Sequence, residues 1–255
     1  MDTAITTMTS GRLWRAYGVE AKYESVRMLR TPAFAGPFLV LPAALYLLFG
    51  ALLFGSAIEK DPKAAWFMFL GFSIMGVMGP GMFGFGITVA TEREHGLLQL
   101  KRALPMPPGA SLLAKMLMSM LFVAIIMASM AAVAPLGHLR VPAGSMLAFS
   151  LVGILGSTPF CALGFLIGTF ASAKSAPAFV NLLYLPMIYL SGILFPMPKS
   201  AEWIARLSPA YHLDRIALAV LGAPGNDGVF VHIVVLAAVT VVCTVLAVRR
   251  LARHG

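Results

Sequence analysis

The chain has 255 residues, of which 59% are hydrophobic and only 11% are Asp, Glu, Lys or Arg. A typical soluble domain has about a quarter charged residues, so this composition excludes a soluble enzyme domain. The net charge of +9 would suggest nucleic-acid binding in a soluble protein. Here the basic residues lie beside apolar segments. This pattern is typical of residues that set the orientation of a membrane protein and contact anionic lipid.

The first 30 residues form a basic, amphipathic segment. Trp14, Tyr17, Ala21 and Met28 recur at helical spacing, with basic residues between them. Because Trp and Tyr prefer the membrane–water interface, we predict a helix that lies on the inner membrane surface. The alternative is an ordinary soluble helix that precedes the membrane domain.

Six charge-poor stretches are long enough to cross a bilayer, which requires about 20 mainly apolar residues. We therefore predict an all-α polytopic membrane protein, with a six-helix domain over residues 31–250 and a cytoplasmic tail over 251–255. Lys and Arg are more numerous in the segments that face inward in this arrangement, so we expect both termini in the cytoplasm. The predicted spans are residues 34–57, 65–90, 113–135, 146–171, 176–196 and 229–249.

Glycines mark the second and fourth predicted spans. The second is rich in glycine and contains Pro80, which predicts close helix packing and a kink. Gly164 and Gly168 form a G-x-x-x-G pair in the fourth, a spacing that lets membrane helices approach closely. A hinge beside a substrate path is the alternative interpretation of the glycine-rich span.

The segment 91–105, which follows the second span, reads T-E-R-E-H-G-L-L-Q-L-K-R-A-L-P. Thr91 and Glu94 fit a capping box, which predicts that a short cytoplasmic helix begins here, and Pro105 ends it. Leucines occupy one face of this helix, and four polar residues share another: Glu92, His95, Gln99 and Arg102. We interpret the segment as an amphipathic helix that presents its polar face to a partner protein. The alternative is a solvated connector.

The region after the fifth span contains an apolar stretch, residues 211–222, that is too short to cross a bilayer. It either dips into the outer leaflet and returns, or forms a short helix in a surface loop. The candidate residues for an outer re-entrant region are Pro196, Trp203, Pro209, Tyr211 and His212.

No motif predicts catalysis or a metal site in this chain. The stretch 168–175, G-T-F-A-S-A-K-S, approaches a phosphate-binding loop, but Ala173 replaces its second glycine and no strand precedes it. Four methionines in the third span, Met116, Met120, Met127 and Met130, suit a soft metal ion. We favour packing, because no Cys or His joins this methionine stripe. The span interiors also lack the charged groups on which ion-coupled transporters depend.

Two motifs resemble the membrane subunit of ATP-binding-cassette exporters of the type-2 permease family. That family often has E-R-E-x-G-T-L-E-x-L after its second span; residues 92–96, E-R-E-H-G, match it, whereas Leu97 and Gln99 replace the usual threonine and glutamate. After the fifth span, S-G-I-L-F-P at 191–196, Trp203 and L-S-P-A-Y-H-L at 207–213 resemble the family's outer re-entrant region.

The resemblance implies the transmembrane subunit of an inner-membrane exporter that pairs with itself or with a similar permease. A separate cytosolic ATPase subunit would bind ATP and Mg²⁺, and this chain would hold no cofactor. The implied ATPase contacts are Glu92, Arg93, Glu94, His95, Gly96, Gln99, Lys101 and Arg102. We expect an amphipathic or hydrophobic substrate of the drug, lipid or polysaccharide class. The alternatives are an ATP-independent channel or carrier, a membrane assembly factor, and a haem- or copper-related permease.

Overall fold

The computed structural model describes residues 10–55, 62–103, 109–137, 139–190, 200, 202–222 and 228–254. Helices follow one another through these ranges, which contain no strand. Five helical stretches within them are long and apolar enough to cross a membrane: Pro32–Leu53, Ala64–Glu94, Ala110–Gly137, Ala143–Gly168 and Val229–Arg253. The prediction of an all-α membrane protein is therefore confirmed.

The fifth predicted span, residues 176–196, corresponds only in part to a described helix. That helix, α10, is apolar but covers 15 residues, Ala176–Leu190. Residues 191–199, which include Pro196, lie outside the described residues. The count of six spans thus stays a prediction.

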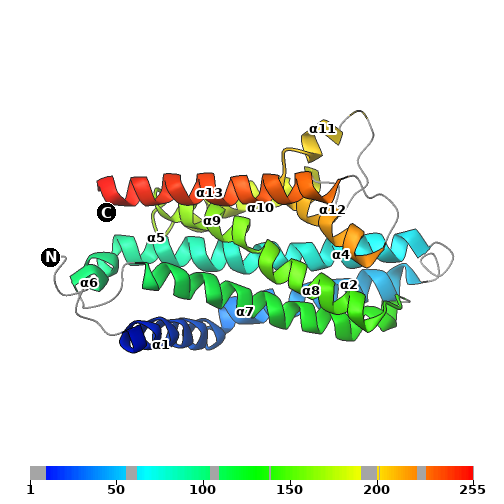
Figure 1. Cartoon of the computed structure of the whole chain (residues 1–255). Coiled ribbons are helices and arrows are strands. Elements are labelled where there is room, and N and C mark those ends of the chain that lie inside the picture. The colour runs from blue at the N-terminus through cyan, green and yellow to red at the C-terminus, as the bar shows by residue number, and fades with distance from the viewer. Residues whose placement is uncertain are drawn as a thin grey trace.

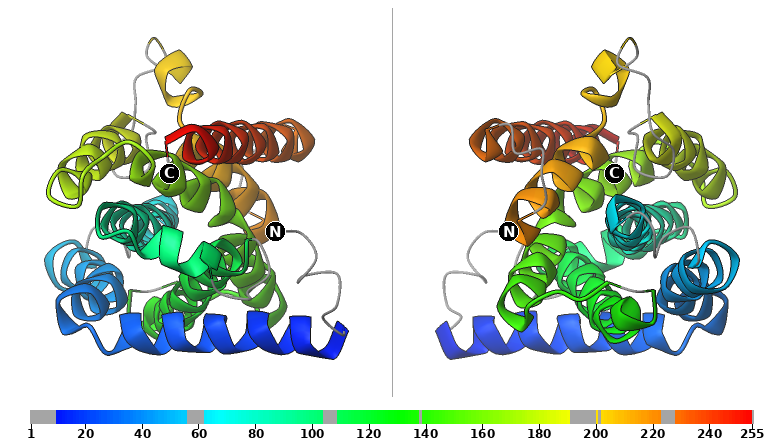
Figure 2. Two further views of the ribbon diagram at one scale, coloured as in Figure 1. Left: turned by 90° about the vertical axis from the view of Figure 1, so that its left-hand side faces the viewer. Right: turned by 90° about the vertical axis from the view of Figure 1, so that its right-hand side faces the viewer.

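The spanning helices run side by side along the long axis of the molecule, and α1 crosses beneath them (Figures 1 and 2). Several spans are assembled from two or three consecutive helices. In chain order, the helices are α1 (Ser10–Leu29), α2 (Pro32–Tyr46), η2 (Leu47–Leu53), α4 (Pro62–Gly79), η3 (Pro80–Phe85), α5 (Gly86–Glu94), α6 (Leu97–Ala103), α7 (Ala110–Val133), η4 (Ala134–Gly137), α8 (Ala143–Gly156), α9 (Thr158–Gly168), α10, α11 (Glu202–Ala205), α12 (Pro209–Leu221) and α13 (Val229–His254).

The second span, α4–η3–α5, is the most enclosed of the five. The π-helical turn η3 begins at Pro80, whose ring nitrogen has no hydrogen to donate. The Pro80 carbonyl accepts a hydrogen bond from Ser119 Oγ of α7 at 3.2 Å. At the position of the predicted kink, the structure thus has a π-helical turn whose first carbonyl is bonded to a neighbouring span.

Glycines allow α9 to pack directly on this central span. A Cβ added at Gly164 would lie 2.5 Å from the Gly81 carbonyl oxygen, and one added at Gly168 would lie 2.7 Å from that of Gly86. Both distances are too short for a real side chain. The G-x-x-x-G pair thus faces a second pair of small residues, and the two backbones touch.

Helix α1 is joined to the bundle through one face. It packs mainly on α7, and its buried residues on that side are Glu24 and Met28. Trp14 and Tyr23 are exposed. The helix itself is confirmed, whereas its position on a membrane surface stays a prediction.

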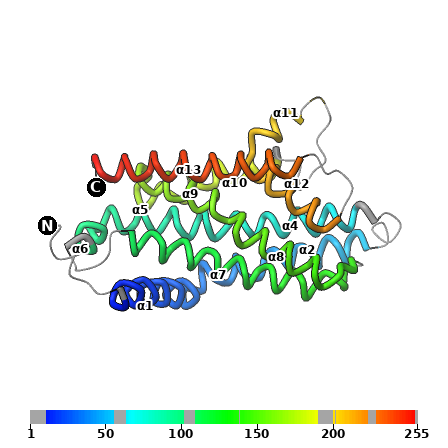
Figure 3. The backbone as a smooth tube through the Cα atoms, in the orientation of Figure 1, coloured from blue at the N-terminus to red at the C-terminus, as the bar shows by residue number. Residues whose placement is uncertain are grey.

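The two ends of the bundle differ in what they contain. Helix α6, α1 and the last turns of α13 gather at one end, and α11 and α12 lie toward the other (Figures 1 and 3). Because α5 leads directly into α6, the coupling segment, residues 91–103, emerges from the enclosed second span.

Candidate functional site

The coupling segment is two helices with a turn between them. Helix α5 continues to Glu94, and α6 begins at Leu97. Thr91 lies inside α5, where its hydroxyl donates to the Ile87 carbonyl at 2.8 Å. The capping-box prediction is therefore wrong, because the span helix continues through Thr91 instead of ending before it. Gly96 has a φ of +71°, and this left-handed backbone makes the turn.

The turn changes which side chains face outward. The predicted polar face assumed one continuous helix through Glu92 and Gln99, and the turn breaks it. Glu92 is buried, with 2% of its side chain exposed, whereas Leu97 and Leu100 are 40% and 59% exposed. The exposed side of the segment also includes Glu94, His95 and Gln99. The side chain of Arg102 and residues 104–108, Pro105 among them, lie outside the described residues.

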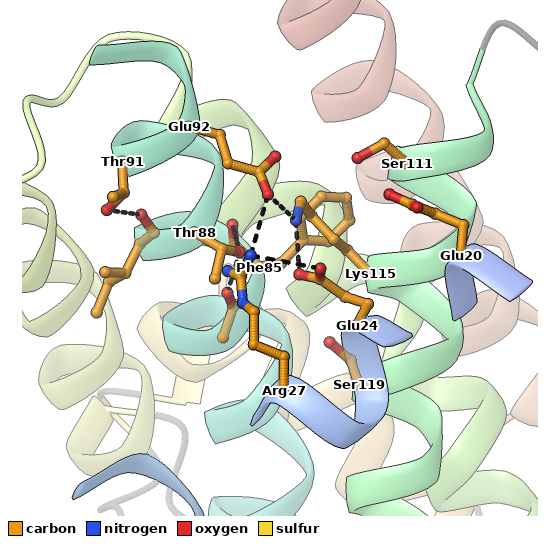
Figure 4. A network of polar contacts seen from close by, with 12 residues as sticks. Glu20, Glu24, Arg27, Phe85, Thr88, Thr91, Glu92, Ser111, Lys115 and Ser119 are labelled. Carbon is orange, nitrogen blue, oxygen red and sulfur yellow. Dashed lines mark hydrogen bonds and ion pairs between the residues drawn. The ribbon is translucent and has the colours of Figure 1, made fainter. Parts of the chain in front are cut away.

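Glu92 is at the centre of a buried charge network (Figure 4). Its Oε1 atom accepts hydrogen bonds from Lys115 Nζ at 2.8 Å and from Lys101 Nζ at 3.4 Å, and lies 3.5 Å from Arg27 Nη1. The Oε2 atom is also buried and has no hydrogen-bond partner within the described ranges. The carboxylate that the sequence pointed to as a partner contact thus binds cations of its own chain.

Lys115 is the inner cation of the network and has no exposed surface. It lies in α7, in a stretch long enough to span the membrane, and donates to Glu24 Oε1 of α1 at 2.6 Å as well as to Glu92. A lysine is almost never fully buried unless it is paired. Here the pairing joins α1, α5 and α7 through one ammonium group.

Lys101 closes the network from α6. Its Nζ atom donates to Glu20 Oε1 at 3.0 Å and to Ser111 Oγ at 2.9 Å. Burial lowers the pKa of Lys101, but the hydrogen bond to Glu20 and the charges of Glu92 and Glu24 outweigh it, so the pKa lies above its usual range. The network therefore contains three carboxylates and three cations. Glu24, Glu92 and Lys115 are its buried members, and each is paired, as buried charges in proteins generally are.

Arg93 and Glu94 contact a different part of the chain, the turn that joins α9 to α10. Arg93 donates Nη1–H to the Thr169 carbonyl and Nη2–H to the Ala171 carbonyl, the latter at 2.7 Å. The Ala173 amide donates to Glu94 Oε2 at 2.5 Å. These contacts involve the stretch that approached a phosphate-binding loop, which here accepts and donates through its backbone.

Arg250 approaches the same end of α9 from the last helix. Its Nε atom donates to the Thr169 carbonyl at 3.4 Å, and its guanidinium lies 5.8 Å from the Phe170 ring centroid. Cations at a helix C-terminus meet the negative end of the helix dipole. The α9 terminus is therefore bound from two sides.

The predicted outer residues lie near α11 and α12. Pro209 is in the first turn of α12, and Tyr211 and His212 are buried there, whereas Trp203 of α11 is exposed. His212 Nδ1 lies 2.7 Å from His232 Nδ1 of α13, and Tyr211 donates to Glu202 Oε1 at 3.3 Å. These contacts tie α11 and the first turns of α12 and α13 together. The re-entrant position of this region stays a prediction.

Within the described ranges, no group of three or more His, Cys, Asp or Glu residues is placed to hold a metal ion. Met127 and Met130 of the methionine stripe are fully buried among apolar side chains. Their surroundings agree with the packing interpretation. Gly164 and Gly168, in turn, lie at the helix contact described above.

Sequence reasoning missed the cations and acids that surround Glu92. Glu20 and Glu24 are four residues apart and so share a face of α1, and Lys115 lies close to the start of a long apolar run. Such spacing signals a charged stripe on one helix and a buried cation on another. Their pairing is a tertiary contact, however, because 91 positions separate Glu24 from Lys115.

A family model for the ABC-2 type transporter matches residues 16–221, which is most of the chain. The match runs from α1 to the last residue of α12 and therefore covers the charge network and the Arg93 contacts. A search of curated proteins found no match. The apolar spanning helices and this match agree, and the chain is an integral membrane protein that belongs to the ABC-2 type transporter family.

Proposed function

We propose that this chain is the transmembrane subunit of an ATP-driven exporter and that a separate ATPase subunit docks on the exposed side of the coupling segment. One observation carries the proposal: an exposed turn with outward-facing Leu97, Gln99 and Leu100 is fixed at its base by a buried charge network. Family membership supplies the class of partner, an ATPase subunit of the ATP-binding-cassette type.

The arrangement suits the transfer of force. A docked subunit would push on α6, and Lys101 of that helix is bound to Glu20 of α1 and to Glu92 of α5. Lys115 joins the same two helices to α7. Movement of α6 is therefore transmitted to three other helices, whereas a solvated connector would bend instead.

The exposed leucines extend the set of contacts that the sequence motif implies. We assign direct ATPase contact to His95, Leu97, Gln99 and Leu100, with Gly96 as the turn that presents them. Glu92 and Lys101 support this surface from behind, because Glu92 is buried and Lys101 is held by three acceptors.

The remaining parts of the proposal follow the family. The subunit acts as a homodimer or with a similar permease in the inner membrane, with both termini in the cytoplasm and α11–α12 as the outer re-entrant region. The largely apolar spans favour an amphipathic or hydrophobic cargo of the drug, lipid or polysaccharide class. ATP and Mg²⁺ bind on the ATPase subunit.

The proposal is tested by co-purification with the cognate ATPase and by transport in liposomes. Leu100→Glu should abolish co-purification and ATP-dependent transport, because it places a charge in an apolar contact. Ala252→Glu, which adds the same charge at the exposed end of α13, should leave both intact. Normal ATPase binding by the Leu100→Glu variant would refute the docking surface, and flux through the purified chain without any ATPase would favour the carrier alternative.

A further inference from the structure

Arg93 donates hydrogen bonds to two carbonyl groups of a single turn. Its two Nη atoms donate separately to Thr169 and Ala171 at the end of α9, while Glu94 accepts the Ala173 amide from the same turn. A guanidinium fork matches two acceptors in one plane, whereas a lysine ammonium has no such fork. The end of α5 is thus attached to this turn by a donor and an acceptor on adjacent residues.

The same turn is stiffened where it enters α10. The Ser172 amide donates to Ser175 Oγ at 3.0 Å, and the Ser175 amide donates to Ser172 Oγ at 3.2 Å. These reciprocal bonds satisfy amides just before Ala176, the first residue of α10, as a capping box does. A displacement of the turn therefore moves the start of α10 with it.

Along much of its length, α10 has a face that no other described part of the chain covers. Phe179, Leu182, Leu183 and Leu185 are exposed. A mid-helix contact joins Tyr184 Oη to the Met75 carbonyl at 3.0 Å. A helix held at its end and pivoted near its middle is suited to tilt when that end is moved.

We infer that Arg93, with Glu94, forms a clamp that makes the coupling segment and the turn 169–175 one mechanical unit, so that a movement of α6 tilts α10. This inference rests on the proposed function, because it assigns a route for the force that the ATPase supplies. Arg93 is then a positioning residue that acts within its own chain. It lies behind the ATPase contact surface, and its side chain is directed to the turn.

If the clamp transmits the movement, its loss should reduce transport without reducing ATP hydrolysis. In Arg93→Ala, the exposed surface of α6 is unchanged, so the ATPase should still co-purify and hydrolyse ATP. The number of substrate molecules moved per ATP should fall by about tenfold, a typical size for the loss of coupling between two sites. Arg93→Lys keeps the charge but reaches one carbonyl at a time, and it should give an intermediate ratio.

A spectroscopic distance tests the mechanical link directly in the assembled complex. Spin labels at Lys22 of α1, which is joined to α6 through the Lys101–Glu20 bond, and at Lys174 in the turn that leads into α10 report the separation of α6 from that turn, in a background with Cys161 and Cys243 replaced by serine. The clamped protein should show one narrow distance distribution with and without trapped ATP. Arg93→Ala should show a broader distribution that shifts when ATP is trapped, because α6 then moves without α10.

The controls separate this inference from the proposed function. Arg253→Ala removes an exposed arginine at the same end of the molecule and should keep the wild-type ratio and distance. If wild-type chain does not bind the ATPase, the proposed function fails. If the ATPase binds and Arg93→Ala transports with the wild-type ratio and an unchanged distance distribution, the docking proposal stands and the clamp is refuted.

Discussion

Lys115→Met is the substitution that tests the charge network most directly. It keeps the length of the side chain and removes the cation. Glu24 and Glu92, both buried, then lose their closest partner, at 2.6 and 2.8 Å. The remaining cations are farther away: Arg27 lies 3.7 Å from Glu24 and 3.5 Å from Glu92, and Lys101 lies 3.4 Å from Glu92.

The expected loss of stability follows from the uncompensated negative charge that Lys115→Met leaves in the interior. Removal of one partner from a buried ion pair costs about 3–5 kcal/mol, because an uncompensated charge stays inside. We expect the free energy of unfolding of Lys115→Met to fall by that amount. Glu24→Gln and Glu92→Gln, added to Lys115→Met, remove the stranded charges and should recover about half of the loss.

Unfolding by SDS in mixed micelles, followed by circular dichroism, measures these differences. Lys22→Met is the matched control, because Lys22 is exposed on α1, and it should change stability by less than about 0.5 kcal/mol. The reasoning is refuted if Lys115→Met unfolds within about 1 kcal/mol of wild type. It is also refuted if neutralising the two glutamates worsens the Lys115→Met variant.

Three further predictions concern other parts of the molecule. Gly164→Ala should cost about 1–3 kcal/mol in the same assay, because its Cβ would lie 2.5 Å from the Gly81 carbonyl; Gly144→Ala, which meets open space, should not destabilise. Gly96→Ala should cost about 1–2 kcal/mol, because φ is +71° there; Gly18→Ala in α1 is its control, and equal stability of the two would contradict the turn. Burial lowers the pKa of the His212 imidazole, and the nearby His232 lowers it further. As pH falls, this imidazole is therefore protonated in the unfolded chain before it is protonated in the folded chain. Stability should be full above about pH 6.5 and decrease below it, and His212→Phe should flatten this part of a pH series of unfolding curves.

The spans were predictable because their signal is local. Apolar composition over about 20 residues identifies a membrane helix without knowledge of its neighbours, and the five described stretches meet that criterion. The G-x-x-x-G spacing of Gly164 and Gly168 also predicted a helix contact from the sequence alone. Only the structure identifies Gly81 and Gly86 as its partners, because the sequence of one helix does not specify which neighbouring helix it contacts.

A helix was expected after the second span and α6 lies there, but the shape of the segment 91–103 was predicted wrongly, and its coupling role stays a prediction. Thr91 and Glu94 have the spacing of a capping box, yet a threonine hydroxyl can equally bond to the carbonyl four residues back inside a helix, and it does so here. Arg93 shows a second limit. Its acceptors at Thr169 and Ala171 are backbone carbonyls, which every residue has, so no side-chain pattern in the sequence announces them.

Glu92 has three cationic neighbours at graded distances from one oxygen, and a second oxygen that holds no partner in the described chain. A single salt bridge would have to break outright whenever its two helices slid apart. The Glu92 carboxylate is instead held at once by cations of α1, α6 and α7, so the loss of one pair leaves two others in place. The junction is therefore redundant, because a displacement of α5 relative to one of these helices is resisted by the other two.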